Sequence, residues 1–501
     1  MSLHPRRGYP PRPGVKTRPV PSTEPAESTI ASARPDGSVI RDPGSFRDPD
    51  SGILLAGNRV YRHFSAAAAK DFDDLTENGL LASFVKSGWV IESTPIDRRD
   101  APHVYAAAPN AALIVEHPRL PFISYPYEWP FEMLREAALL QLEITLTALD
   151  AGFMLKDATP YNFQFVRGKP LLIDIGSFER YEDGAPWIAY TQFCKMFFNP
   201  LLMQAFTAMP FQPWLRSSLE GIDSAHLSSV LPLRRKFRRA VFLDVVLQAS
   251  LSRRQSSSKP VDGQERKIRP IPKAVIVGML KRLRGAISSL KRHAGGSGWL
   301  DYEAQCPSYT PEAIAFKDCF VENAVRVAQP EMVWDLGCNV GRYSTIAGRH
   351  ANYVVAIDGD EPTVGAMYER AEAGENVLPL VEDLLNPSPG QGWAHSERQS
   401  LESRGPADFA LGLALVHHLA IAGNVPLTKI AEWLASVTRA GVVEFIPKAD
   451  PMVQTLLRNR RDVFGDYSQE GFEAALGRHF EIKESVNIPA SQRTLYRIER
   501  R

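Results

Sequence analysis

The sequence predicts an α/β protein in two parts, an N-terminal α+β part and a C-terminal part built on a mostly parallel, seven-stranded sheet. The C-terminal sheet is predicted because apolar runs alternate with helix-compatible segments after residue 299, as in sheets whose strands are joined by crossover helices. The first run leads into a glycine-punctuated turn, and the second ends in Asp358. The N-terminal part instead begins with a hairpin and a long helix.

Length and composition limit the classes of function. The 501 residues suggest two or three domains. Lys and Arg number 58 against 57 Asp and Glu, so no global charge indicates a nucleic-acid partner. The four cysteines have no CxxC spacing, and the chain has no secretory leader and no run of about 20 apolar residues. We therefore expect a cytoplasmic protein with reduced cysteines and no membrane span.

Composition divides the chain into four segments. Stretches rich in Pro, Ser and charged residues indicate disorder or linkers, whereas apolar periodicity indicates folded domains. The predicted segments are a disordered tail at 1–45, an α+β domain at 46–251, a linker with a basic helix and a flexible joint (295–298) at 252–298, and a second domain at 299–501.

The N-terminal elements follow from apolar spacing and turn residues. Residues 178–250 are expected to be mainly helical, with a basic cluster at 234–239. The elements expected before them are a hairpin at 53–62 turning at Gly57–Asn58, a helix at 70–87, a strand at 111–116, a proline-stiffened aromatic connector at 121–130, and a long helix at 131–151.

A second informative stretch follows the long helix. Asp157 and Asn162 form the pattern D-x-x-x-x-N, and a short strand then ends at Asp174 in the pattern D-x-G. Such residues can simply satisfy N–H groups of turns, which is the structural alternative to a site.

Residues 273–293 form a basic amphipathic helix without an acid. Its apolar residues share one face, which suits either packing against a domain or contact with an anionic membrane surface. We favour packing.

The glycine-punctuated turn is the main candidate site. Gly337 and Gly341 follow a strand that contains Asp335, and glycine permits both unusual backbone angles and close approach of a ligand. The next strand ends in Asp358, where an acid is placed to bind a ribose diol. The alternative is a turn that only packs a helix and binds nothing.

Further candidates follow the later strands of the C-terminal part. Ligands bind beyond the carboxyl ends of such strands, so His417 and His418 are candidate general bases. Glu444 would orient one of them or bind a substrate amine. Later strands are expected at 377–381, followed by Glu382 and Asp383, at 407–415, at 441–447 after a helix at 427–440, at 480–482 and at 494–498.

The segments DLGCNVGRYS (335–344) and VVAIDGD (354–360) resemble the cofactor site of class I S-adenosylmethionine-dependent methyltransferases, which have a Rossmann-like sheet. Asn339 stands at the middle glycine of that family's loop, as in members with a DLGCN signature. The resemblance implies that S-adenosyl-L-methionine is bound by Asp335, Gly337, Asn339, Gly341, Asp358 and Asp383, with Asp383 rather than Glu382 at the adenine amino group.

The segment around Asp157, Asn162 and Asp174 is similar to the catalytic loop and metal-binding strand of kinase-like folds. That resemblance implies Asp157 as a base, Asn162 and Asp174 as magnesium ligands, and ATP as cofactor. A glycine-rich phosphate loop and a strand lysine are not evident, and Leu155-Lys156 replaces the usual His-Arg pair. We therefore expect a kinase-like shape without efficient phosphate transfer.

Over about 50–250 and 299–501, the chain also resembles a group of bacterial two-part methyltransferases related to rhizobial nodulation proteins. The resemblance rests on FISYPYEW, LKDATPYNFQF, LALVHHL and EFIPKADPMVQ. It implies methylation of an oxygen or nitrogen of a small or saccharide-type acceptor that the sequence does not identify. The alternatives are a kinase-like phosphotransferase with a regulatory cofactor-binding domain, and a scaffold that binds the cofactor without turnover.

Overall fold

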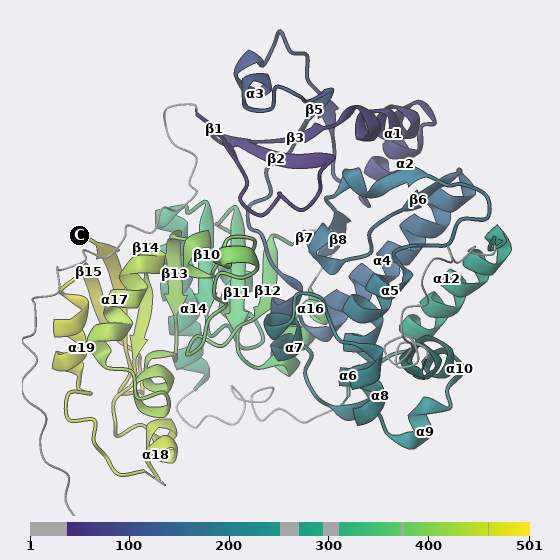
Figure 1. Cartoon of the computed structure of the whole chain (residues 1–501). Coiled ribbons are helices and arrows are strands. Elements are labelled where there is room, and N and C mark those ends of the chain that lie inside the picture. Colours follow the sequence, from purple (N-terminus) through teal and green to yellow (C-terminus); the bar gives the residue numbers. More distant parts are fainter. Residues whose placement is uncertain (1–37, 251–269, 294–309, 372–374, 459) are drawn as a thin grey trace, which may run out of the picture. The chain divides into compact units, whose positions relative to one another are not determined.

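The structure is a computed structural model that describes residues 38–250, 270–293, 310–371, 375–458 and 460–501 (Figure 1). The described residues all belong to one compact unit. Several predictions lie outside the described residues: the tail before residue 38, the linker at 252–269, the joint at 295–298, and the start of the second domain at 299–309.

The C-terminal part contains the predicted seven-stranded sheet, with the strand order β12-β11-β10-β13-β14-β16-β15. The pairs among β12, β11, β10, β13 and β14 are parallel, and β16 runs antiparallel to both of its neighbours. The parallel strands therefore bring their carboxyl ends to one edge. The strands are β10 (Met332–Leu336), β11 (Tyr353–Asp358), β12 (Val377–Val381), β13 (Ala407–Gly412), β14 (Thr438–Phe445), β15 (Phe480–Asn487) and β16 (Thr494–Arg500).

Several predicted boundaries in this part are wrong; the strand predicted at 480–482, for example, continues to Asn487. Two of the differences have a clear local cause. The fourth strand ends at Gly412 rather than at 415, because Ala414 adopts a positive φ of 50° that extended backbone does not allow. The fifth strand begins at Thr438, since Thr438 already pairs with Ala407. The helices are α14 (Pro311–Ala328), α15 (Arg342–Gly348), α16 (Glu361–Arg370), α17 (Leu427–Val437), α18 (Pro451–Leu457) and α19 (Gln469–Leu476).

The N-terminal part begins earlier than predicted. The segment Val39–Arg41 is a strand that pairs with the next one, so the predicted tail at 1–45 extends too far. The hairpin and its turn at Gly57 are confirmed. The five-stranded sheet has the order β1-β2-β3-β5-β4. Its strands are β1 (Val39–Arg41), β2 (Ser51–Ala56), β3 (Arg59–Phe64), β4 (Thr94–Pro95) and β5 (Leu113–His117).

The helix predicted at 70–87 is two helices, because Gly79 adopts a left-handed φ of 78° between them. The long helix, α4, is confirmed and is largely buried along its length. The helices are α1 (Ala66–Glu77), α2 (Leu80–Lys86), α3 (Pro102–Ala107), α4 (Phe131–Asp150), α5 (Tyr190–Phe193), α6 (Asn199–Thr207), α7 (Gln212–Ser217), α8 (Ser224–Val230), α9 (Leu233–Lys236) and α10 (Arg239–Val241).

Short strands follow α4 and carry the second motif. They form two antiparallel pairs, β6 with β9 and β7 with β8. Asn162 precedes the β7–β8 pair and Asp174 follows it, so this hairpin brings these two residues close together. The strands are β6 (Phe153–Leu155), β7 (Phe163–Val166), β8 (Lys169–Leu172) and β9 (Phe178–Arg180).

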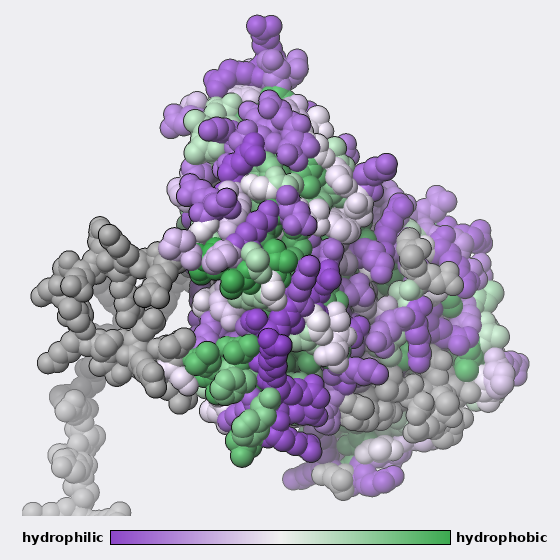
Figure 2. Space-filling view, turned by 90° about the vertical axis from the view of Figure 1, so that its right-hand side faces the viewer, coloured by the Kyte–Doolittle hydropathy of each residue, from purple (hydrophilic) through white to green (hydrophobic). Residues whose placement is uncertain are grey.

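The basic helix α12 (Lys273–Ser288) ends before residue 293 and packs against α4, as favoured above. Its apolar residues Ile276, Leu280, Leu283 and Ile287 are buried. Because these apolar residues are already buried inside the protein, they are not available for contact with a membrane surface. The molecular face in Figure 2 is mainly hydrophilic, with apolar residues in small patches. Among the described residues, no helix is long and apolar enough to cross a bilayer.

The aromatic connector is buried rather than exposed. Tyr125, Tyr127 and Trp129 are each at most 7% exposed. Arg404, from the segment before β13, donates hydrogen bonds to Glu128 and to the Ile123 carbonyl (2.8 Å to the latter). Both charged side chains of this pair are at most 2% exposed. The connector therefore forms part of a shared core instead of a free hinge.

Candidate functional site

The loop between β10 and α15 has the backbone that its glycines permit. Gly337 and Gly341 have φ values of 81° and 82°. A Cβ on Gly341 would lie 2.5 Å from Met367 Cε, so a larger residue does not fit there without movement. Asn339, at the middle glycine position of the resembled motif, has a φ of 50°. Asparagine is one of the few residues that tolerates this left-handed region, which explains how it replaces a glycine.

Asp335 lies beneath this loop. Its side chain accepts a 2.6 Å hydrogen bond from Ser344 Oγ on α15, and the residue is 2% exposed. Burial, opposed by the Ser344 hydrogen bond, raises the pKa of Asp335 to about 7. Asp335 therefore links β10 to α15 beneath the loop and does not lie at the surface of the loop.

Asp358 closes the same loop from the end of β11. Its Oδ2 accepts the Asn339 N–H at 2.8 Å, and its Oδ1 accepts the Asp360 N–H at 2.9 Å. Burial raises its pKa, while these N–H groups oppose the shift. Each carboxylate oxygen has a second lone pair, so Asp358 can still accept two hydroxyl protons. This donor and acceptor set fits the ribose of a nucleoside cofactor.

The two acids that follow β12, Glu382 and Asp383, differ in burial. Glu382 is buried and accepts hydrogen bonds from the Ser388 N–H and hydroxyl, and burial raises its pKa to about 7. Asp383 is exposed, and its Oδ1 accepts a 2.9 Å hydrogen bond from the Leu385 N–H. Asp383 is therefore the more accessible of the two acids.

His417 and His418 lie beyond the end of β13, with ring centroids 4.1 Å apart. His417 is fully buried, and neither of its ring nitrogens has a hydrogen-bond partner among the described residues. Burial, with contributions from His418, Arg493 and Lys317, lowers the pKa of His417 well below its usual value. Burial also lowers the pKa of His418 to about 4. Both imidazoles are therefore neutral at pH 7.

Glu444, on β14, is held by groups that sequence reasoning missed. Its Oε2 accepts from Lys317 Nζ at 2.7 Å and from the Ala414 N–H at 2.9 Å. Arg493 Nη1 lies 3.7 Å from its other oxygen, and Arg493 Nε donates to Asp450 at 2.8 Å. All four side chains are at most 4% exposed. We call Lys317, Glu444, Arg493 and Asp450 the buried charge network.

One member of this network could have been found in the sequence. Lys317 falls on the buried stripe of α14, four residues after Ala313 and four before Val321. A lysine at a core position of an amphipathic helix indicates a buried anionic partner, because an unpaired buried charge is costly. No comparable signal marks Arg493, since it follows a loop and precedes the last strand.

The predicted residues of the N-terminal motif are partly brought together. Asn162 Nδ2 donates to Asp174 Oδ2 at 3.2 Å. Arg62, which sequence reasoning missed, reaches Asp174 Oδ1 from β3 at 2.7 Å. Burial is the main cause that raises the pKa of Asp157, and nearby Asp174 adds to it. Among the described residues, no group of three or more His, Cys, Asp or Glu could hold a metal ion.

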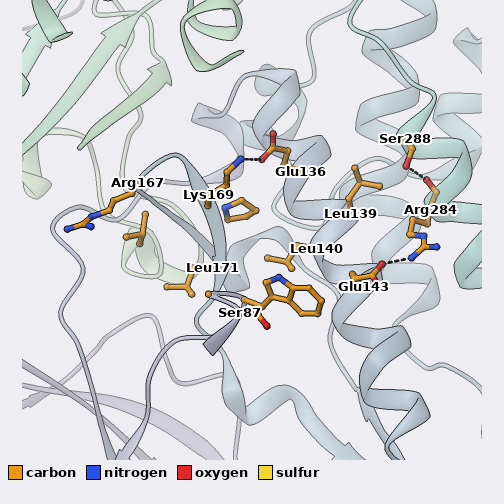
Figure 3. A pocket seen from close by; sticks show the side chains of 14 residues that line it. Ser87, Glu136, Leu139, Leu140, Glu143, Arg167, Lys169, Leu171, Arg284 and Ser288 are labelled. Atoms are coloured by element: carbon orange, nitrogen blue, oxygen red, sulfur yellow. Dashed lines mark hydrogen bonds and ion pairs between the residues drawn. The ribbon is translucent and has the colours of Figure 1, made fainter. Parts of the chain in front are cut away.

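A cavity of about 780 Å³ lies elsewhere in the N-terminal part, between α4, α12 and the β7–β8 hairpin. Its floor is apolar, and Figure 3 shows two ion pairs at it, Lys169 with Glu136 and Arg284 with Glu143. None of the predicted site residues lines it. Volume alone therefore does not mark the chemical site, which is defined by the loop and acids of the C-terminal sheet.

The strand order, the glycine-rich loop and the acid at the end of β11 together define a class I S-adenosylmethionine-dependent methyltransferase. A curated relative identifies the family: nodulation protein NoeA from Rhizobium meliloti (strain 1021) is 38% identical over 448 residues, which cover 88% of this chain and 92% of that protein. The chain belongs to the family of this nodulation protein.

Comparisons with solved structures gave matches of low global similarity. N-methyltransferase NodS from Bradyrhizobium japonicum WM9, in complex with S-adenosyl-L-homocysteine, matches at a TM-score of 0.29 and 12% identity, covering 40% of this chain and 96% of that one. The bifunctional kinase-methyltransferase WbdD matches at 0.26 and 18% identity, covering 37% and 38%. No family model matches the chain.

Proposed function

We propose that the chain transfers the methyl group of S-adenosyl-L-methionine to an oxygen or nitrogen of a small or saccharide-type acceptor. The observation that carries this proposal is the loop at Gly337–Gly341 closed by Asp358, at the edge where five parallel-paired strands end. The cofactor supplies a methyl group that its sulfonium already activates. The protein must therefore align the acceptor, remove a proton where necessary, and exclude water.

Asp358 and Asp383 are the residues that would hold the nucleoside. Asp358 would accept the ribose hydroxyls, and the exposed Asp383 would accept from the adenine amino group. Gly337, Asn339 and Gly341 would form the surface against which the cofactor lies. Asp335 would act through Ser344, by keeping strand and helix together beneath that surface. These roles are proposals that rest on the placement of each side chain.

The histidines would stand near the transferred methyl group. Their support is their position beyond β13 and their neutral state, since only a neutral imidazole can accept a proton from the acceptor. His417 is enclosed and His418 is partly exposed, so His418 is the easier of the two for an acceptor to reach. A general base typically contributes about 10²–10⁴ in rate, so alignment would supply the larger share.

Glu444 is better suited to positioning than to proton transfer. It accepts from Lys317 and from the N–H of Ala414, whose backbone has a φ of 50°. A hydrogen bond to that N–H would hold the left-handed residue and therefore the loop that leads to His417. We propose that Glu444 fixes this loop and does not bind the acceptor.

The first experiment identifies the acceptor. Metabolite profiles of otherwise identical cells with and without the gene would be compared, and accumulated unmethylated compounds would be incubated with purified full-length protein and labelled cofactor. Transfer of label to a hydroxyl or amine is the expected result. Cofactor binding without transfer to any accumulated compound would instead favour a non-catalytic scaffold.

The second experiment assigns the histidines once an acceptor is available. His417→Ala and His418→Ala would be compared at saturating cofactor, with affinity for S-adenosyl-L-homocysteine measured in parallel. A drop in rate with unchanged affinity is expected for the residue that accepts the proton. If both variants keep the wild-type rate and pH profile, the histidines are structural.

A further inference from the structure

Asp174, the acid where a kinase-like site would use a metal, is paired with a fixed cation of the chain's own. We propose that Arg62 is the resident cation at Asp174: its guanidinium takes the place of a divalent metal ion there, so Asp174 and its neighbours bind no such ion as long as Arg62 is present. This inference is independent of methyl transfer.

The position of Arg62 is set by the sheet and by several hydrogen bonds. It lies on β3, which is paired on both sides, with β2 and with β5. Its Nη1 donates to Asp174 Oδ1 at 2.7 Å and to Ser51 Oγ at 3.0 Å. Its Nη2 donates to the Ile173 carbonyl at 3.3 Å. The Arg62 side chain is only 10% exposed, so its ion pair with Asp174 is held in place and is not a mobile pair at the surface.

Both carboxylate oxygens of Asp174 already accept from donors of the chain. Arg62 uses one carboxylate oxygen, and the amide nitrogen of Asn162 uses the other at 3.2 Å. A magnesium or manganese ion requires oxygen ligands, which from asparagine means the amide oxygen. Asn162 therefore presents Asp174 with a donor where metal binding would need an acceptor.

The positive charge of Arg62 also opposes the binding of a metal ion at Asp174. Arginine remains protonated at all ordinary pH values, so its positive charge stays beside Asp174. A divalent ion at the same carboxylate would meet a like charge at close range and lose much of the attraction of the acid. Asp157 contributes a second negative charge to the surroundings of Asp174, yet among the described residues no group of three His, Cys, Asp or Glu side chains gathers there.

Removal of the guanidinium should convert the surroundings of Asp174 into a metal site. Asp174 would lose its cation, and Asn162 can turn its amide oxygen inward by rotation of the side chain. Asp174, Asn162 and Asp157 would then offer oxygen ligands, with water completing the shell. Lysine at position 62 would retain the positive charge, so it should not create the site.

The test uses full-length protein and manganese ion, which gives a spectroscopic signal when free. Loss of the free Mn²⁺ electron paramagnetic resonance signal would be titrated for wild type, Arg62→Ala, Arg62→Met and Arg62→Lys. The two neutral variants should bind Mn²⁺ at least about tenfold more tightly than wild type, and Arg62→Lys should remain like wild type. Arg62→Met keeps most of the apolar stem, so one neutral variant remains if the alanine variant does not fold.

Two controls make the gain specific. Arg62→Met combined with Asp174→Asn should lose the added affinity, because the acid is required. Arg59→Ala removes an arginine from the same strand that pairs with Glu116 at the surface, and it should leave Mn²⁺ affinity unchanged. Tight Mn²⁺ binding by wild type that Asp174→Asn abolishes would overturn the proposal. A folded Arg62→Met variant without increased affinity would overturn it too.

Discussion

Asp358 and Asp174 are both acids that follow short apolar strands, yet the protein gives them different neighbours. Asp358 accepts two backbone N–H groups of its own loop, which leaves lone pairs for hydroxyl groups. Asp174 instead accepts from the guanidinium of Arg62 and the amide of Asn162. An acid at a strand end is therefore insufficient to define a site, because the donors around it decide what it can still bind.

The largest expected effect concerns Glu444, a buried acid of the C-terminal part that no ligand needs to touch. Glu444→Ala would leave Lys317 and Arg493 without this buried partner, and breaking a buried pair typically costs about 3–5 kcal/mol. Urea denaturation would measure this loss. Glu432→Ala, which removes an exposed pair with Lys429, should leave stability almost unchanged. Equal costs for the two variants would contradict the structural role of the network.

The pH dependence of stability should show that Asp335 differs from an exposed acid. Its pKa is raised from 3.8 to about 7, so between these values the folded protein holds a proton that the unfolded chain has released. The unfolding free energy should therefore fall as pH rises through this window, by up to about 1.4 kcal/mol per pH unit from this group.

Asp335→Asn should reduce that slope while keeping an acceptor for Ser344. Part of the slope should remain, because the pKa of Glu382 is also raised to about 7. Denaturation curves between pH 5 and pH 8 would be compared at constant ionic strength, using about three pH values within the window. An unchanged slope in Asp335→Asn would show that Asp335 is ionised throughout.

A smaller effect is expected from the backbone of the loop. Gly341→Ala places a Cβ against Met367 at a φ of 82°, which should cost about 1–3 kcal/mol and weaken affinity for S-adenosyl-L-homocysteine. Gly278→Ala, in α12, has open space around the new Cβ and should be neutral or slightly stabilising. Thermal unfolding and calorimetry of both variants would separate loop geometry from a general effect of added methyl groups.

The smallest effect is expected at Asp174, because that pair is partly exposed. Asp174→Asn keeps an oxygen for Arg62 and should cost about 1–2 kcal/mol, less than Glu444→Ala. It should leave affinity for S-adenosyl-L-homocysteine unchanged, since it lies in the other part of the chain. A strong loss of cofactor affinity in this variant would break the distinction between the two acids.

The fold was predictable where each element has its own local signal. The parallel strands of the C-terminal sheet contain short apolar runs, and glycines mark the loop that follows β10. Boundaries were less predictable, because they depend on residues far away in the chain: Thr438 pairs with Ala407, and the N–H of Ala414 donates to Glu444. The break at Gly79 shows the same limit, since apolar spacing continues across it.

The site was predictable only for residues within one motif. Glu444 and Asp174 were identified, but their cationic partners were missed because these lie far away in the chain. Lys317 is 127 residues from Glu444, and Arg62 is 112 residues from Asp174. Strand residues such as Arg62 alternate between faces, so their type alone does not reveal which acid they will meet.

Calorimetric titration with S-adenosyl-L-homocysteine tests the central claim most directly. Wild type should bind, and Asp358→Ala should lose at least about 100-fold in affinity, since two charge-assisted hydrogen bonds of about 1.5–3 kcal/mol each would disappear. Asp408→Ala is the matched control, because Asp408 also accepts a backbone N–H, from Met332, but at the opposite ends of the strands. The control should bind like wild type. Equal affinity of wild type and Asp358→Ala, or no binding by wild type, would contradict the assignment of the cofactor site.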